Sequence, residues 1–137
     1  MDGRVLGGGG DDQIIMASTG SVGTIFGGGG NDDVTLSSGT VTNTVFTNAG
    51  DDTVTLNGTI VNGRIETSDG HDGVTVNSGS VQRIKTGKGF DDVVMNGGLV
   101  SNRIQTGAAA DTVTINGGEV ARVITNSGND VWSILLL

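Results

Sequence analysis

The chain has 137 residues, of which 26 are glycine and none is proline or cysteine. Without cysteine there are no disulfide bridges and no thiolate metal sites, and the glycines do not recur at every third position as collagen requires. The 15 acidic residues against 7 basic ones give a formal net charge of −8, which repels nucleic acid and favours cations. The apolar run at the C-terminal end is far too short to span a bilayer.

A repeat of 19–20 residues runs through the whole chain. Its apolar anchors are Val5, Ile25, Val45, Ile65, Ile84, Ile104 and Val123. An aspartate follows each anchor by seven residues, and large apolar residues follow each aspartate by two and by four. This alternation predicts a strand with one buried face. A unit this short can bury that face only by stacking on its neighbours.

We therefore predict an all-β fold, a parallel β-solenoid similar to a β-roll. Seven coils of 19–20 residues would form a single domain over residues 1–137. A strand spacing of about 4.8 Å makes such a stack about 34 Å long. The density of glycine disfavours helices.

Each aspartate ends a glycine-rich turn. Residues 7–15 read GGGGDDQII and residues 27–35 read GGGGNDDVT, and both match the pattern G-G-x-G-x-D-x-U-x, in which U is a large apolar residue. The later turns keep the aspartate but lose glycines, and the sixth reads TGAAAD. The two complete matches, in phase with five partial ones, resemble the calcium-binding nonapeptide of the repeats-in-toxin (RTX) family.

This resemblance implies one calcium-binding turn per coil, with several Ca²⁺ ions in a single ladder between adjacent turns. Calcium takes six to eight oxygen ligands at about 2.3–2.6 Å, and glycine permits the positive φ that turns carbonyls inward. The implied carboxylate ligands are Asp12, Asp32, Asp52, Asp72, Asp91, Asp111 and Asp130. The implied carbonyl donors are Gly8, Gly10, Gly28 and Gly30. Because the opposite turns have no aspartate column, we expect the ladder on one edge only.

The aspartates also have a simpler interpretation, in which each one only caps its own turn. If the aspartates bind calcium, their seven like charges repel one another without the ion, and folding would be coupled to calcium binding. We expect a weak or empty site at residues 108–110, where alanine replaces the glycines, and a site at Asp91 weakened by Lys88.

An arginine stripe precedes the anchors. It consists of Arg4, Arg64, Arg83, Arg103 and Arg122. Its two interpretations are a site for an anionic glycan or a lipopolysaccharide phosphate, and a solvated stripe that balances the acidic edge.

Two further columns are expected to point outward. One joins Thr35, Thr55, Thr75 and Thr114 to Asn57, Asn77, Asn96 and Asn116. It predicts either an ice-binding face or a hydrogen-bonded asparagine ladder. The other consists of Leu6, Phe26 and Phe46, which either form an exposed contact patch or turn inward at a bend.

The two ends of the chain suggest assembly. Residues 134–137 followed by residues 1–5 of another copy would complete a coil, so Met1, Trp132, Leu135, Leu136 and Leu137 are expected at an interface. Such a head-to-tail contact does not close and gives filaments. Alternatively, the last leucines cap the core or belong to a C-terminal secretion signal.

The sequence therefore favours a secreted, calcium-binding structural protein that assembles with itself into a matrix or surface layer. The RTX resemblance implies export by a type I system, without an N-terminal signal peptide. The alternatives are a monomeric module that binds ice or an anionic glycan, and a non-catalytic module of a larger secreted enzyme. With one histidine and no nucleophile–base pair, we do not expect catalysis. We expect neither a nucleic-acid partner nor a membrane span.

Overall fold

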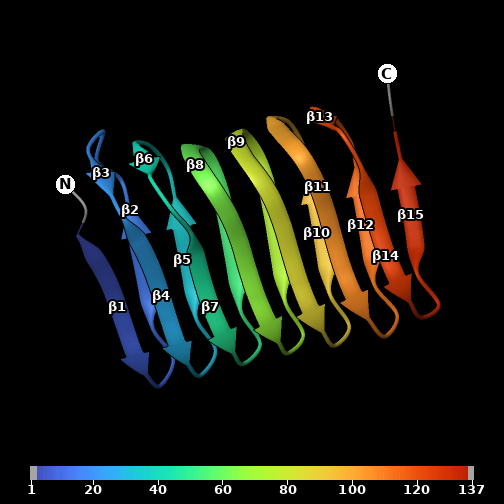
Figure 1. Cartoon of the computed structure of the whole chain (residues 1–137), viewed down its shortest axis with the longest axis horizontal. Coiled ribbons are helices and arrows are strands. Elements are labelled where there is room, and N and C mark those ends of the chain that lie inside the picture. Colours follow the sequence, from blue (N-terminus) through green and yellow to red (C-terminus); the bar gives the residue numbers. More distant parts are fainter. Residues whose placement is uncertain (1–2, 136–137) are drawn as a thin grey trace.

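The computed structural model describes residues 3–135. These residues form fifteen β-strands and no helix, so none of them lies in a helix that could cross a membrane. All the strand pairs are parallel. The strands wind in successive coils along one long axis (Figure 1). The predicted parallel β-solenoid of about seven turns is confirmed.

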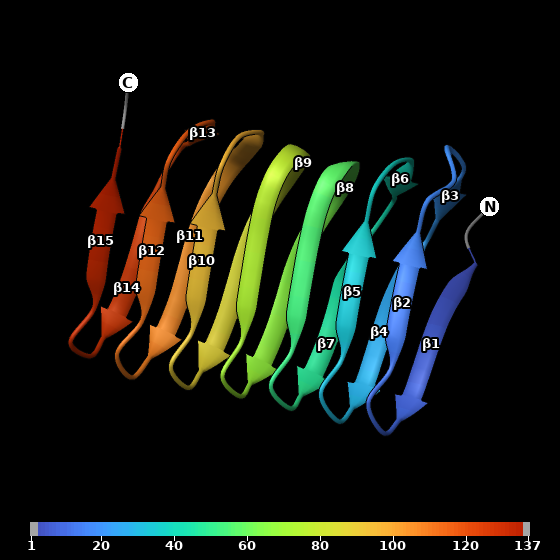
Figure 2. The ribbon, with the colours of Figure 1, turned by 180° about the vertical axis from the view of Figure 1, so that it is seen from behind.

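Each coil contributes to two long walls and one short wall. The first long wall contains β1 (Arg4–Gly9), β4 (Thr24–Gly29), β7 (Val45–Ala49), the ends of β8 (Thr53–Asp69), β9 (Gly73–Lys88) and β11 (Leu99–Ala108), and β14 (Val123–Ser127). The second contains β2 (Gln13–Met16), β5 (Asp33–Leu36), the starts of β8 and β9, β10 (Asp92–Met95), β12 (Thr112–Ile115) and β15 (Val131–Ile134). Figure 2 shows this second wall from the opposite side of the molecule.

The short third wall closes each coil. It consists of β3 (Ser21–Val22), β6 (Thr40–Val41), the middle parts of β8 and β9, the start of β11, and β13 (Glu119–Val120). We number the coils one to seven by their anchors, so that coil one begins at Val5 and coil seven at Val123.

The core follows from the spacing of the repeat. Because the units are 19–20 residues long, like residues pair with like, as Ile25 does with Val45 and Val45 with Ile65. The buried apolar side chains among residues 3–135 all come from the anchor column, the two columns after the aspartate, and the valine column of the third wall. Each coil therefore buries its apolar face against the coils on either side of it.

An asparagine ladder runs along one outer corner. The Nδ2 of Asn77 donates to Oδ1 of Asn57 at 2.7 Å, Asn96 donates to Asn77 at 2.8 Å, and Asn116 donates to Asn96 at 2.9 Å. The hydrogen-bonded ladder expected for this column is present. The threonines Thr35, Thr55, Thr75 and Thr114 stand beside it on the second wall, half-buried and facing outward.

The column of Leu6, Phe26 and Phe46 lies on the outer surface of the first wall and does not turn inward. Leu6 is 68% exposed. The rings of Phe26 and Phe46 stack with centroids 5.4 Å apart, and the Arg64 guanidinium lies 5.3 Å from the centroid of the Phe46 ring. The arginine thus covers one end of this small apolar patch.

Truncating a core residue tests the stacked columns. Leu56 is fully buried, so Leu56→Ala should lower the free energy of unfolding by about 2–5 kcal/mol, measured by urea denaturation. The matched control is Ile60→Ala in the same strand, because Ile60 is 47% exposed and its truncation should cost less than about 1 kcal/mol. Equal losses for the two variants would contradict the assigned core.

Candidate functional site

The seven turns at the aspartate edge share a pattern of positive φ. In every turn the second and fourth residues, counted from residue 7 of the first turn, have positive φ. Glycine occupies most of these positions, but Asn48, Ser68, Ala109 and Asn126 adopt φ of 76°, 84°, 91° and 65°. The turn geometry therefore persists where the glycines are lost, including the alanine-rich sixth turn.

Close contact between coils gives a second reason for glycine at these positions. A Cβ atom on Gly28 would lie 1.8 Å from the carbonyl oxygen of Gly8, and one on Gly30 would lie 2.4 Å from that of Gly10. A Cβ atom on Gly50 would lie 1.9 Å from the carbonyl oxygen of Gly30. Three of the four carbonyls predicted as calcium donors, those of Gly8, Gly10 and Gly30, therefore point along the stack toward the next coil.

The seven predicted aspartates stand in one column, each linked to its neighbour. One oxygen of each carboxylate after Asp12 accepts a hydrogen bond from the backbone N–H of the aspartate one coil earlier. The pairs are Asp12 to Asp32 at 3.0 Å, Asp32 to Asp52 at 2.8 Å, Asp52 to Asp72 at 2.9 Å, Asp72 to Asp91 at 2.9 Å, Asp91 to Asp111 at 3.0 Å and Asp111 to Asp130 at 3.0 Å. These bonds join adjacent coils, whereas simple turn capping would keep them within one turn.

The second carboxylate oxygen is buried and has no hydrogen-bond donor. This holds for Oδ2 of Asp12, Asp32, Asp52, Asp72, Asp91 and Asp111. Apart from Asp12, these side chains belong to residues that are at most 2% exposed. A buried anionic oxygen without a partner is costly, so the column needs a compensating group.

In coil one the orphaned oxygen packs closely against Gly7. A Cβ atom placed on Gly7 would lie 2.6 Å from Oδ2 of Asp12 and 2.4 Å from the carbonyl oxygen of Gly27. Oδ2 of Asp32 approaches Gly27 of its own turn in the same way. A carboxylate and a carbonyl that converge in this manner are the oxygen donors that calcium prefers.

The turns bring too few acidic side chains together to surround a metal ion. No three histidine or acidic side chains among residues 3–135 gather around one point. An ion in these turns would therefore depend on backbone carbonyls for most of its ligands. The Gly27 carbonyl, which the motif did not single out, is the first candidate.

The electrostatics of the column reflect its burial. Burial raises the pKa of Asp91 to about 6, and the charges of Asp72 and Asp111 add to the rise, while the Thr86 hydroxyl and the Asp72 amide oppose it. Burial likewise raises the pKa of Asp72, against the opposing effect of the Thr67 hydroxyl. For Asp32, burial raises the pKa and the Asp12 amide opposes the rise.

A threonine column, which sequence reasoning overlooked, lines the later turns. Two residues after each anchor, glycine stands in coils one and two and threonine in coils three to seven, as Gly7, Gly27, Thr47, Thr67, Thr86, Thr106 and Thr125. Four of these threonines, from Thr47 to Thr106, are fully buried. When the seven repeats are aligned on their anchors, the threonine column is visible, but in the motif it counts only as a loss of glycine.

A second ladder runs along the exposed side of the first turns. The Asp11 carboxylate accepts from the Asn31 amide at 2.8 Å, the Asn31 side chain from the Asp51 amide at 2.9 Å, and the Asp51 carboxylate from the His71 amide at 2.9 Å. Lys88 lies near this edge, but its ammonium pairs at 3.6 Å with Asp69 of the preceding coil, and both side chains are largely exposed.

The arginine stripe is continuous over coils four to six. Arg64, Arg83 and Arg103 pair in register, whereas Thr24 stands opposite Arg4 and interrupts the stripe. The carboxylate of Glu66 forms ion pairs with Arg64 at 2.6 Å and Lys85 at 2.8 Å.

These ion pairs set the charge state of Glu66. Burial alone would raise the pKa of Glu66, but the Lys85 hydrogen bond and the charges of Lys85 and Arg64 lower it below its ordinary value. Within residues 3–135, Arg83, Arg103 and Arg122 form no such ion pair.

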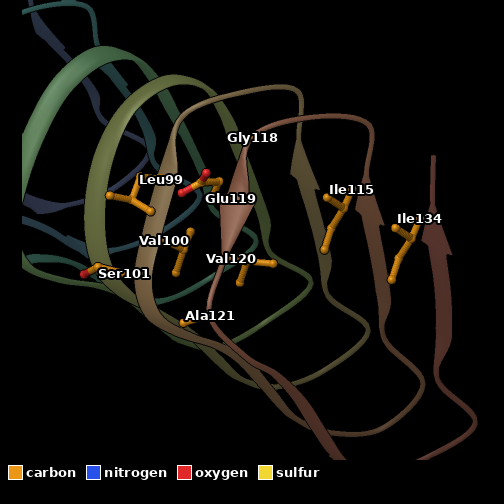
Figure 3. Close-up of a pocket in the computed structure, with 9 residues that line it drawn as sticks. All are labelled: Leu99, Val100, Ser101, Ile115, Gly118, Glu119, Val120, Ala121 and Ile134. Atoms are coloured by element: carbon orange, nitrogen blue, oxygen red, sulfur yellow. The ribbon is translucent and has the colours of Figure 1, made fainter. Parts of the chain in front are cut away.

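Both ends of the described solenoid expose core residues. At the C-terminal end a hollow is lined by Leu99, Val100, Ile115, Val120 and Ile134 among others, as Figure 3 shows. A smaller hollow at the N-terminal end is lined by Val5, Ile14, Met16, Val22 and Ile25 with their neighbours.

Two of the predicted interface residues lie at the C-terminal end. Trp132 occupies the inward column opposite Val113 but is 50% exposed, because no described coil packs on it, and Leu135 is 56% exposed. Met1, Leu136 and Leu137, predicted at the same interface, lie outside the described residues.

No protein-family model matches the chain, and no curated protein or solved structure matches it either. The resemblance to the RTX nonapeptide therefore depends on the motif residues alone.

The raised pKa values predict an unusual response to acid. A carboxyl whose folded pKa is raised stabilises the fold below its unfolded pKa and loses that contribution as pH rises through the folded value. In the presence of a chelator, the free energy of unfolding should therefore fall as pH rises from about 4.5 to about 6, mainly through Asp91, with Asp32 and Asp72 acting in the same direction. Glu66 acts in the opposite sense, but below its ordinary pKa of 4.5.

Urea denaturation across this pH range measures the effect. Asp91→Asn cannot titrate at this position and should show a flatter dependence than the unmodified chain. Stability that rises steadily from about pH 4.5 to about pH 6 would contradict the assigned burial of these carboxyls.

Proposed function

We propose that this protein is an extracellular structural protein that binds calcium in its glycine-rich turns, gains stability from the ion, and stacks head to tail into filaments. The observation that carries the proposal is the column of buried aspartate oxygens without donors. Each of these atoms belongs to a turn whose backbone places alternate residues at positive φ. The column and the motif point to the same ligand.

The energetic argument is one of charge compensation. Carboxylates in successive coils are separated by about the strand spacing of 4.8 Å, and burial weakens the screening between them. A divalent cation between two such groups replaces repulsion with attraction and supplies a partner for each orphaned oxygen. Calcium tolerates irregular oxygen coordination better than magnesium does, so it fits a turn built mainly of carbonyls.

The first two turns would hold the ion best. Asp12 and Asp32 supply carboxylate oxygens, and Gly27 supplies a carbonyl that lies beside Gly7, as the Asp12 carboxylate does. Bound calcium would supply positive charge and a link between coils one and two. Millimolar calcium outside the cell suits such a site, and the RTX resemblance is the basis for the proposed type I export.

A single charge-removing substitution tests calcium binding. Asp32→Asn can keep the acceptor for the Asp12 amide while removing the negative charge. Without calcium the variant should be more stable than the unmodified chain, because a buried unpaired charge is gone. With calcium at about 100 times its Kd, the unmodified chain should gain about 2.7 kcal/mol per site, and the variant should gain less. Thermal unfolding with calcium and with a chelator measures both changes.

The matched control is Asp11→Asn. It removes the same charge from an exposed residue whose column holds asparagine in the next coil, as Asn31. It should leave the calcium response nearly unchanged, and magnesium should not substitute for calcium in either protein. If the unmodified chain shows no calcium response, the calcium proposal is wrong.

Stacking is supported by the two ends of the solenoid. Within residues 3–135, β1, β2 and β3 pair on one side only, as do β13, β14 and β15 at the other end. Because every coil is parallel and in register, one end presents the donors and acceptors that the other end lacks. The exposed apolar hollows lie within these same faces, so a second copy would cover strand edges and core together.

A charge placed in the end face should block assembly. Ile134 is 54% exposed at the C-terminal hollow, whereas Ile60 is 47% exposed on the third wall in the middle of the stack. Electron microscopy at millimolar calcium should show filaments for the unmodified chain and for Ile60→Glu, and monomers for Ile134→Glu. Monomers of the unmodified chain would reject stacking, and loss of filaments in Ile60→Glu alone would indicate lateral contacts instead.

A further inference from the structure

Four arginines follow one another along the corner where the third wall meets the first. Arg64, Arg83 and Arg103 pair in register. The carbonyl of Arg122 accepts from the amide of Ile104 at 2.9 Å, so Arg122 continues the column by one more coil. The backbones of successive arginines are therefore about 4.8 Å apart, which is the spacing of neighbouring strands.

Two hollows lie along this arginine column and share two of their lining residues, Gln82 and Asn102. The first is lined by Thr44, Gly63, Arg64, Gln82, Arg83 and Asn102. The second is lined by Gln82, Ser101, Asn102, Ala121 and Arg122. Together they form a groove that combines guanidinium groups with amides and hydroxyls. None of its lining residues is acidic or aromatic.

Most of these guanidinium groups have no counter-charge. Arg64 pairs with Glu66, but within residues 3–135 no carboxylate lies within ion-pair distance of Arg83, Arg103 or Arg122. The Nε of Arg103 is moreover buried and has no hydrogen-bond acceptor. A buried donor without a partner is costly, so the column favours an anion that would lie along it.

The acidic turns are too far away to supply that anion. Arg103 lies where the first-wall part of β11 begins, and Ala108 ends the strand at the aspartate edge. At about 3.3 Å per residue these two positions are about 16 Å apart, whereas the Debye length at physiological ionic strength is about 8 Å. The arginines therefore do not neutralise the aspartate edge. They give this corner a local positive charge in an acidic protein.

We propose that the groove binds a linear anionic polysaccharide, whose carboxylate or sulfate groups pair with successive guanidiniums of Arg83, Arg103 and Arg122. The planar guanidinium matches the geometry of such anions, and the amides of Gln82 and Asn102 can donate to and accept from sugar hydroxyls. Single-stranded nucleic acid fits less well, because its sites stack the bases on aromatic side chains. This binding does not depend on calcium.

Calorimetric titration in the presence of a chelator tests the groove, because no calcium can then bridge an anionic sugar to the acidic turns. Polygalacturonate offers carboxylates, dextran sulfate offers sulfates, and neutral dextran is the control polymer. We expect at least one charged polymer to bind, more weakly as salt is added, and dextran not to bind. The inference is wrong if neither charged polymer binds, if dextran binds equally well, or if single-stranded DNA binds more tightly than both.

Single substitutions locate the binding surface. Arg83→Gln and Arg122→Gln each remove one charge from the groove, and each should weaken binding of the charged polymer by about 10-fold. The matched control is Arg4→Gln, because Thr24 separates Arg4 from the arginine column, and its affinity should stay nearly unchanged. All three side chains lie outside the apolar core, so the melting temperatures should change little. Equal losses in the three variants, or no loss in the two groove variants, would overturn the inference.

Discussion

The hydrogen bond between each aspartate carboxylate and the backbone amide one coil earlier is the constraint on which the rest of the structure depends. It joins all seven turns, from Asp12 to Asp130. Bonds to a charged acceptor are stronger than neutral ones, so this column fixes the axial register at the edge where the chain turns. The same bond places the second carboxylate oxygen in the interior, where it has no hydrogen-bond donor. The interaction that fixes the register therefore also buries negative charge.

The chain answers this problem by local means at each turn. Glycine lets the carboxylate approach the backbone closely in coils one and two, threonine hydroxyls in later turns donate to carbonyls of the next coil, and the exposed column of Asp11, Asn31 and Asp51 adds a second set of amide acceptors. Each device acts only between adjacent coils, as expected for a repeat protein whose stability is a sum over neighbours. A change in one turn should therefore affect its two neighbours and leave distant coils intact.

Most of the fold could be predicted from spacing alone. In coils two to five, the anchors, the valine column and the two columns after each aspartate are all buried as the alternation requires, because a period of two and a fixed repeat length determine both the face and the register. Position in the stack was harder to judge: Trp132 follows the inward pattern but is half exposed at the end. At the turns, the motif identified the aspartates but gave no indication that Oδ1 bonds to a neighbouring coil.

The threonines show why the rest could not be predicted. Gly27 and Thr47 occupy equivalent positions in the repeat. Gly27 matches the motif, whereas Thr47 counts as a lost glycine. The two residues differ in the side-chain volume that they place next to the buried Oδ2 of Asp32 or Asp52. The effect of that volume depends on the direction in which Oδ2 points. Spacing along a chain does not encode that direction, whereas three-dimensional packing does.

The orientation of the strands determines how this molecule would bear load. The strands run across the long axis (Figure 1), so the backbone hydrogen bonds between coils lie nearly along it. Tension applied at the two ends would open one ladder of bonds at a time and unwind the coils in succession, at low force. Pressure on the sides would meet packed walls, and a fibre built on this plan would be extensible along its length and stiff across it.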